Sequence, residues 1–142
     1  MLKSFRHQKT KENNMVQITS QEIAQFRSQL AEYPEALKAL DEIEDCEGDI
    51  EDAAISLAIQ VGQEPNVSDN WLDGLAKRCR VAICRSEIKE ELTNGQLNAA
   101  FRDLSAAKLC PDVLVPSVII YVLKTGVKDF CEPLDYKLTV DS

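Results

Sequence analysis

The sequence is poor in histidine, glycine, proline and aromatic residues, and each shortage excludes a class of protein. The only histidine is His7, so the rest of the chain has no imidazole to bind zinc or to activate a serine or cysteine nucleophile. Five glycines and five prolines in 142 residues exclude a collagen-like or low-complexity chain. An aromatic fraction of 6% argues against a β-sandwich or a β-barrel.

Common catalytic and phosphate-binding motifs are missing as well. The chain contains no G-x-S-x-G, Walker A or G-x-G-x-x-G pattern, so it lacks the loops that present a nucleophile or hold a phosphate. We therefore expect no catalytic residues, no metal site and no cofactor, and we expect that the protein is not an enzyme.

Long hydrophobic runs are also absent. The most apolar stretch, residues 113–127, is too short to cross a bilayer and contains Pro116 and Lys124. A secretory signal requires an apolar segment directly after the basic N-terminus, and this chain has none there. We expect a soluble, cytoplasmic protein that does not contact a membrane.

Negative charge dominates the sequence, with a formal net charge of −8. Residues 1–14 hold four basic residues and one acidic residue, whereas the remaining chain holds 12 basic and 23 acidic residues and carries −11. An acidic body repels phosphate backbones and favours basic partners or solubility. Residues 1–14 show no apolar periodicity and are predicted to be a disordered basic arm. Whether Met15 is the true start of the protein stays open.

Five cysteines are distributed along the chain without C-x-x-C spacing: Cys46, Cys79, Cys84, Cys110 and Cys131. Free cysteines pack as small hydrophobic side chains, so we expect buried, reduced thiols. The spacing of Cys79 and Cys84 points their side chains to different sides of a helix. A thiol-based redox protein that uses Cys79 or Cys84 is a further hypothesis.

Apolar residues recur at helical spacing along most of the chain, which predicts one all-α domain over residues 15–142. We expect a single compact domain of about six helices with short connections, arranged as a bundle or an orthogonal array. Thr19 and Glu22 match a capping box at the start of the first helix, and Pro34 suits the start of the second.

The third and fourth predicted helices follow the Gly48-Asp49 break. Asp49 suits the N-cap of a helix that ends at Gly62, and its apolar stripe predicts a central helix with Leu57 buried. Ser68 suits the cap of a longer, continuous fourth helix that reaches about Leu92. A fifth helix follows Asn94-Gly95, and the last, over residues 116–123, is apolar on every side.

Residues 20–61 resemble the three-helix ubiquitin-associated module. The similarity lies in Ala39-Leu40, Gly48-Asp49 and Ala53-Ala54 with Leu57. The chain departs from the family in two places, because the segment between Leu40 and Gly48 is longer and residues 31–33 replace the Met-Gly-Phe turn. The resemblance implies helix–turn–helix packing, and we assign no function from it.

The densest feature is DEIEDCEGDIED, over Asp41–Asp52, with eight acidic residues. Clustered oxygen ligands suit calcium, but an EF-hand register with Gly48 at its sixth position puts Ile43 and Ala54 where carboxylates are needed. We expect a solvated corner between two helices, with Asp49 supporting the following helix through its dipole. Whether this acidic corner binds anything stays open.

Two groups of residues are candidate partner contacts. Ile120 and Tyr121 are expected on an exposed flank of the last helix, where they would serve homodimerisation or docking of a protein partner, and the alternative is that the other helices enclose the last helix completely. Arg78, Arg85 and Lys89 share one side of the fourth helix by spacing, and either contact a partner or pair with nearby acids.

The sequence therefore predicts a small helical protein that acts by protein–protein interaction, as an adaptor, regulator or accessory subunit. The alternative is a nucleic-acid-associated regulator that uses the basic face of the fourth helix and the N-terminal arm. The acidic body weighs against nucleic acid as a partner.

Overall fold

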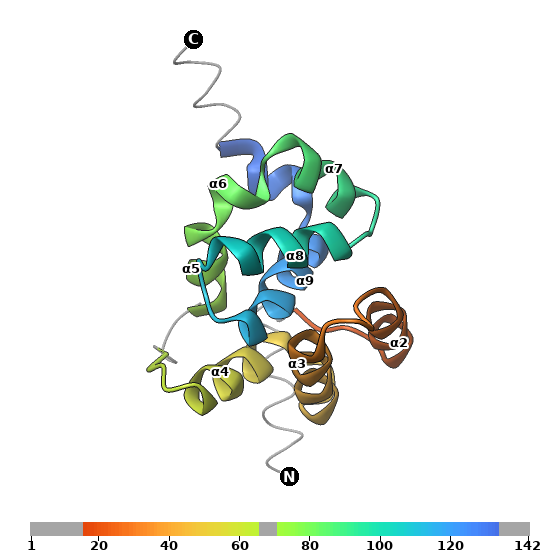
Figure 1. Cartoon of the computed structure of the whole chain (residues 1–142), viewed down its shortest axis with the longest axis vertical. Helices are drawn as coiled ribbons and strands as arrows, with labels where there is room; N and C mark the ends of the chain where they lie inside the picture. The colour runs from red at the N-terminus through yellow and green to blue at the C-terminus, as the bar shows by residue number, and fades with distance from the viewer. Residues whose placement is uncertain (1–15, 66–70, 134–142) are drawn as a thin grey trace.

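The computed structural model describes residues 16–65 and 71–133, and within these ranges the chain folds into helices joined by short connections (Figure 1). The predicted all-α class is confirmed, since the described residues form no strand beyond one isolated bridge between Gln17 and Asp49. The predicted arm over residues 1–14, the cap at Ser68 and the chain end after residue 133 lie outside the described residues.

The helices are more numerous and shorter than the six expected. In chain order they are α2 (Ser20–Gln29), α3 (Pro34–Asp45), α4 (Ile50–Gln60), α5 (Trp71–Arg78), α6 (Arg80–Ile83), α7 (Ser86–Thr93), α8 (Asn98–Ala107), the 3₁₀ helix η1 (Asp112–Leu114) and α9 (Val115–Thr125). Residues 127–133 are also helical. In the part of the chain that the structure describes, no helix is long and apolar enough to cross a membrane.

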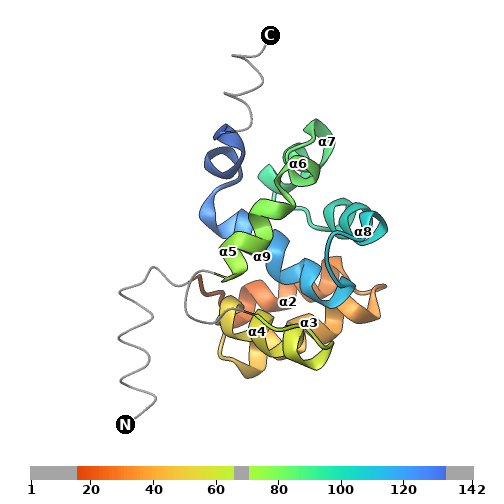
Figure 2. The same ribbon diagram turned by 90° about the vertical axis from the view of Figure 1, so that its left-hand side faces the viewer.

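The helices form two groups with α9 between them. Helices α2, α3 and α4 lie at one end of the molecule, whereas α5 to α8 lie toward the other (Figures 1 and 2). Helix α9 packs against α3 and α4 on one side and against α5, α7 and α8 on the other. It is therefore the central helix of the described fold.

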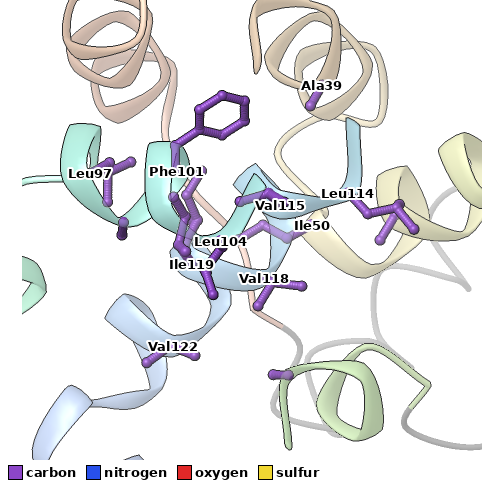
Figure 3. Close-up of a cluster of buried hydrophobic side chains, with 14 of the residues drawn as sticks. Ala39, Ile50, Leu97, Phe101, Leu104, Leu114, Val115, Val118, Ile119 and Val122 are labelled. Atoms are coloured by element: carbon purple, nitrogen blue, oxygen red, sulfur yellow. The ribbon is translucent and has the colours of Figure 1, made fainter. Parts of the chain in front are cut away.

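The core follows from the composition of α9. All of its residues from Val115 to Ile120 are buried, and Val122 is buried as well. Figure 3 shows Val115, Val118, Ile119 and Val122 among side chains from α3, α4 and α8. A helix without a polar face must be enclosed by protein. Helix α4 was predicted to be central, and its Leu57 is buried as expected, but its C-terminal Ile59 is exposed.

Local signals set several helix ends as predicted. The Thr19 side chain accepts a hydrogen bond from the Glu22 N–H at 3.1 Å, and the Glu22 carboxylate accepts one from the Thr19 N–H at 2.9 Å. This reciprocal pair completes the capping box of α2. Pro34 stands in the first turn of α3, where its missing N–H costs nothing, and Pro116 does the same in α9.

Gly48 has a tertiary role as well as a local one. Its backbone is left-handed, with φ 87°, and its carbonyl accepts a hydrogen bond from the Ile18 N–H at 3.0 Å. A Cβ here would collide with the Ile18 carbonyl oxygen, so only glycine lets the two segments approach. The segment between Leu40 and Gly48, expected as a long connection, is instead mostly helix because α3 continues to Asp45.

The predicted fourth helix is not continuous, which corrects the expectation of one helix to about Leu92. It ends at Arg78, resumes as the short α6 and restarts as α7, with Arg85 in an extended conformation at φ −62° and ψ 144°. The break has a packing reason. Ile83 and Ile88 are both buried, and their five-residue separation cannot place both on the same stripe of one straight helix.

Candidate functional site

The predicted contacts on α9 do not form an exposed flank. Ile120 is 0% exposed, and Tyr121 is half-buried with its hydroxyl donating a hydrogen bond to Asp73 Oδ1 at 2.7 Å. The expectation that Ile120 faces a partner is therefore wrong, because the surrounding helices enclose this part of α9.

The Asp73 carboxylate accepts the hydrogen bond from the Tyr121 hydroxyl. Burial opposes its charged form, but hydrogen bonds from Lys77 and Tyr121 outweigh burial and lower the pKa of Asp73. Burial and the nearby Asp73 raise the pKa of Tyr121. This contact joins α9 to α5 inside the fold and explains why a tyrosine stands in an otherwise aliphatic helix.

The basic residues of the predicted fourth helix lie on different elements. Arg78 ends α5, Arg85 precedes α7, and Lys89 lies half-buried within α7. Because the chain turns at Cys79 and Cys84, helical spacing no longer places these three side chains on one face. Helical spacing therefore no longer supports a shared basic face for Arg78, Arg85 and Lys89. That these residues contact a partner stays a prediction.

The acidic corner makes structural contacts within the fold. Asp41 and Glu44 both pair with Arg27 of α2. The Asp49 carboxylate caps α4 by accepting the Asp52 N–H at 3.0 Å, and Glu51 accepts the backbone N–H groups of the first residues of α5. These contacts satisfy helix N-termini and hold neighbouring helices together, as expected of carboxylates near the positive end of a helix.

Two groups beside this corner titrate abnormally. Asp49 is buried, and burial together with the nearby Asp52 raises its pKa to about 6. Burial and the surrounding carboxylates, Glu42 first among them, raise the pKa of the Cys46 thiol to about 11. Cys46 is therefore a poor nucleophile at neutral pH, because the thiolate is the reactive form.

The described surface contains an open groove between the two groups of helices, with a volume of about 580 Å³. Its walls come from the first turn of α3, the end of α4 and the connection from α8 to η1. The lining residues are Glu35, Val61, Gln63, Lys108, Leu109, Cys110, Pro111, Asp112 and Val113.

Two large apolar side chains are exposed at this groove. Val61 is 44% exposed and Leu109 is 45% exposed. Leu109 follows Lys108, which ends α8 in the left-handed conformation at φ 58°. A non-glycine residue in this conformation costs about 1–2 kcal/mol. The turn at Lys108 is therefore unfavourable by itself, and it leaves the apolar side chain of Leu109 exposed to water.

Charged residues surround the apolar part of the groove. Lys108 pairs with Asp112 at 3.8 Å, and Glu35 adds a further carboxylate from the exposed first turn of α3. The groove thus combines exposed apolar side chains with charged groups of both signs. Sequence reasoning missed this site, because its walls come from three segments and no single segment has a distinctive pattern.

Four of the five cysteines form two pairs, and Cys46 is a separate free thiol. Cys84 and Cys131 are joined in a disulfide, which overturns the expectation that every cysteine is reduced. Cys79 and Cys110 are free thiols that hydrogen-bond to each other. Cys110 lines the groove, so the site contains a thiol as well as apolar and charged groups.

Comparisons with known proteins identify no relative of this chain. No protein-family model matches it, and neither a curated protein nor a solved structure gives a significant match.

Proposed function

We propose that the protein acts by protein–protein interaction, as an adaptor, regulator or accessory subunit, and that it binds a segment of its partner in the groove beside Leu109. One observation carries this proposal: two large apolar side chains, Val61 and Leu109, remain exposed around a single hollow of the surface. Apolar side chains gathered at a concave site are typical of binding surfaces, whereas single exposed ones need no explanation.

The groove indicates the chemistry of the bound segment. A volume of about 580 Å³ lies within the usual range of about 300–1,000 Å³ for ligand sites, which suits one or two side chains of a peptide. We expect an apolar anchor side chain between Val61 and Leu109. A basic residue beside the anchor would face Glu35, in keeping with the acidic body of the chain.

The experiment selects binding peptides from a random library. The library is displayed on phage and panned against the full chain, and the affinity of enriched peptides is measured by fluorescence polarisation. Leu109→Asp should weaken binding about tenfold or more, as expected for a contact at the centre of an interface. Val81→Asp is the matched control, because Val81 is 66% exposed on α6 and does not line the groove.

Three results would count against the proposal. Enrichment of no peptide, equal losses of affinity in both variants, or peptides without an apolar anchor would show that this groove does not bind a protein segment. Size-exclusion chromatography of the unmodified chain distinguishes the remaining case, in which a second copy occupies the groove and Leu109→Asp converts a dimer to a monomer.

The nucleic-acid alternative and the cytoplasmic location stay predictions. A gel-shift assay with DNA and RNA tests the first, since binding to phosphates weakens steeply as the salt concentration rises. Complex formation that is lost on replacing Arg78 and Arg85 would favour that alternative.

A further inference from the structure

Two cysteine pairs flank the four-residue helix α6. Cys79 immediately precedes this helix and Cys84 immediately follows it. Cys84 is already bonded to Cys131. Cys79 instead contacts Cys110, which lies on the connection between α8 and η1. The fold therefore brings two sulfur atoms, 31 residues apart in the sequence, together without bonding them.

The two free thiols differ in their access to solvent. Cys110 is half-buried and lines the groove, whereas Cys79 is 1% exposed. A reagent that enters the groove meets Cys110 first. Cys79 then lies one hydrogen bond behind it, which is the arrangement of an attacking thiol and a resolving thiol.

The surroundings of this pair favour a thiolate. The hydrogen bond from Cys110 lowers the pKa of Cys79 although burial opposes the change, and the guanidinium of Arg78 acts in the same direction. The same hydrogen bond and burial raise the pKa of Cys110. The pair therefore holds its proton on Cys110 and its negative charge on Cys79, and Cys110 becomes the thiolate only when its proton passes to Cys79 through this hydrogen bond.

We propose that Cys110 and Cys79 form a redox-active pair that exchanges with low-molecular-weight disulfides entering the groove. The Cys110 thiolate attacks a sulfur of the small disulfide, forms a mixed disulfide and releases one small thiolate. The released small thiolate takes the proton from Cys79, and the Cys79 thiolate then attacks the Cys110 sulfur, forms the Cys79–Cys110 bond and displaces the second small thiolate. Two protein thiols are oxidised, one small disulfide is reduced to two thiols, and the two protons pass to these thiols.

The rest of the chain makes this reaction selective. Burial and the surrounding carboxylates disfavour the thiolate of the half-buried Cys46, whereas the proton of Cys110 can pass to Cys79 through the hydrogen bond between them. Cys84 and Cys131 are already bonded to each other. Among the described cysteines, Cys110 therefore has the access that a first attack requires and a partner that can resolve the product.

The test uses the full chain and oxidised glutathione as the probe. The protein is equilibrated at several ratios of oxidised to reduced glutathione, quenched with acid and unfolded, and its free thiols are alkylated before peptide mapping. In the unmodified chain, alkylation of Cys79 and Cys110 should disappear together, and a peptide cross-linked by these two residues should form. Cys46 should remain alkylated, and Cys46→Ala should leave the result unchanged.

Two variants identify the roles of the pair. In Cys79→Ala, glutathione should stay attached to Cys110 and accumulate about tenfold or more above its level in the unmodified chain, because nothing resolves it. In Cys110→Ala, the buried Cys79 should remain alkylated after quenching. Circular dichroism checks that each variant folds. If a variant does not fold, the cross-linked peptide of Cys79 and Cys110 in the unmodified chain still tests the proposal.

Several outcomes would overturn the proposal. One is that Cys79 and Cys110 both remain fully alkylated at the most oxidising ratio. Another is that the mixed disulfide on Cys110 accumulates equally with and without Cys79. A third is that Cys79 is oxidised in the absence of Cys110. A pairing of Cys110 with Cys84 or Cys131 in the cross-linked peptides would equally exclude the pair named here.

Discussion

The Lys124 ammonium at the end of α9 donates a hydrogen bond to Oε2 of Glu22 in α2 at 2.8 Å, across 102 positions of sequence. The other oxygen of the same carboxylate accepts the Thr19 N–H in the capping box. The Glu22 side chain therefore caps the N-terminus of α2 and also ties that helix to the central helix α9.

Replacing Glu22 separates its two roles. Glu22→Gln keeps a carbonyl oxygen for the cap and removes the ion pair, so the free energy of unfolding should fall by up to about 1 kcal/mol. Glu22→Ala removes both contacts and should cost about 1–2 kcal/mol. Urea denaturation of both variants with Lys124→Met completes a double-mutant cycle, and a coupling of zero would show that the ion pair contributes nothing.

The same carboxylate makes part of the stability depend on pH. Its hydrogen bond with Lys124 is the main reason that the pKa of Glu22 is lowered from 4.5. Its contribution is therefore present above that value and is lost as the pH falls through the lower pKa of the folded state. In Glu22→Gln this loss at acidic pH should disappear.

Gly48 and Gly62 form a matched pair for a backbone test. Both have left-handed backbones, with φ 87° and φ 83°, but a Cβ at Gly62 meets nothing within 4 Å whereas one at Gly48 collides with the Ile18 carbonyl. Gly62→Ala should cost about 1–2 kcal/mol, the usual penalty of this conformation. Gly48→Ala should cost more, because the segment before α2 must also move. Equal costs in thermal denaturation would show that the clash is relieved without loss.

Asp49→Asn should raise stability at neutral pH. Its pKa is raised above 3.8 to about 6, so its contribution is fully present below the lower value and is lost as the pH rises through the higher one. Asparagine caps a helix equally well without a charge, so the variant should gain about 1–3 kcal/mol at pH 7. The gain should vanish near pH 4, where both side chains are neutral. A variant that is less stable than the unmodified protein at pH 7 would show that the charge supports the cap.

Ile120→Ala should destabilise the fold by about 2–5 kcal/mol, because it removes most of a fully buried side chain from the central helix. Leu57→Ala in α4, which is 1% exposed, should give a loss in the same range. Urea denaturation measures both, and size-exclusion chromatography should show no change in either variant. A loss of unfolding free energy below about 1 kcal/mol for Ile120→Ala, together with altered elution, would show that Ile120 lies at an interface between chains.

The limits of sequence interpretation show clearly in the fourth predicted helix. The stretch from Trp71 to Leu92 contains no glycine after Gly74 and no proline, so nothing local marks an end. The one available signal was the five-residue step from Ile83 to Ile88, which does not fit a repeat of 3.6 residues. The break at Arg85 satisfies packing against different neighbours, and local propensity is too weak to prevent it.

The sequence by itself determined the all-α class, the capping box at Thr19, the helix starts at Pro34 and Pro116, and the turn at Gly48. These depend on contacts within a few residues, where backbone chemistry leaves few choices. The tertiary structure alone decided that α9 is enclosed, that Cys84 bonds to Cys131, and that Val61, Leu109 and Cys110 share one groove. Each of these joins segments that are distant in sequence, and such contacts depend on how the helices pack as a whole rather than on the residues near any one of them.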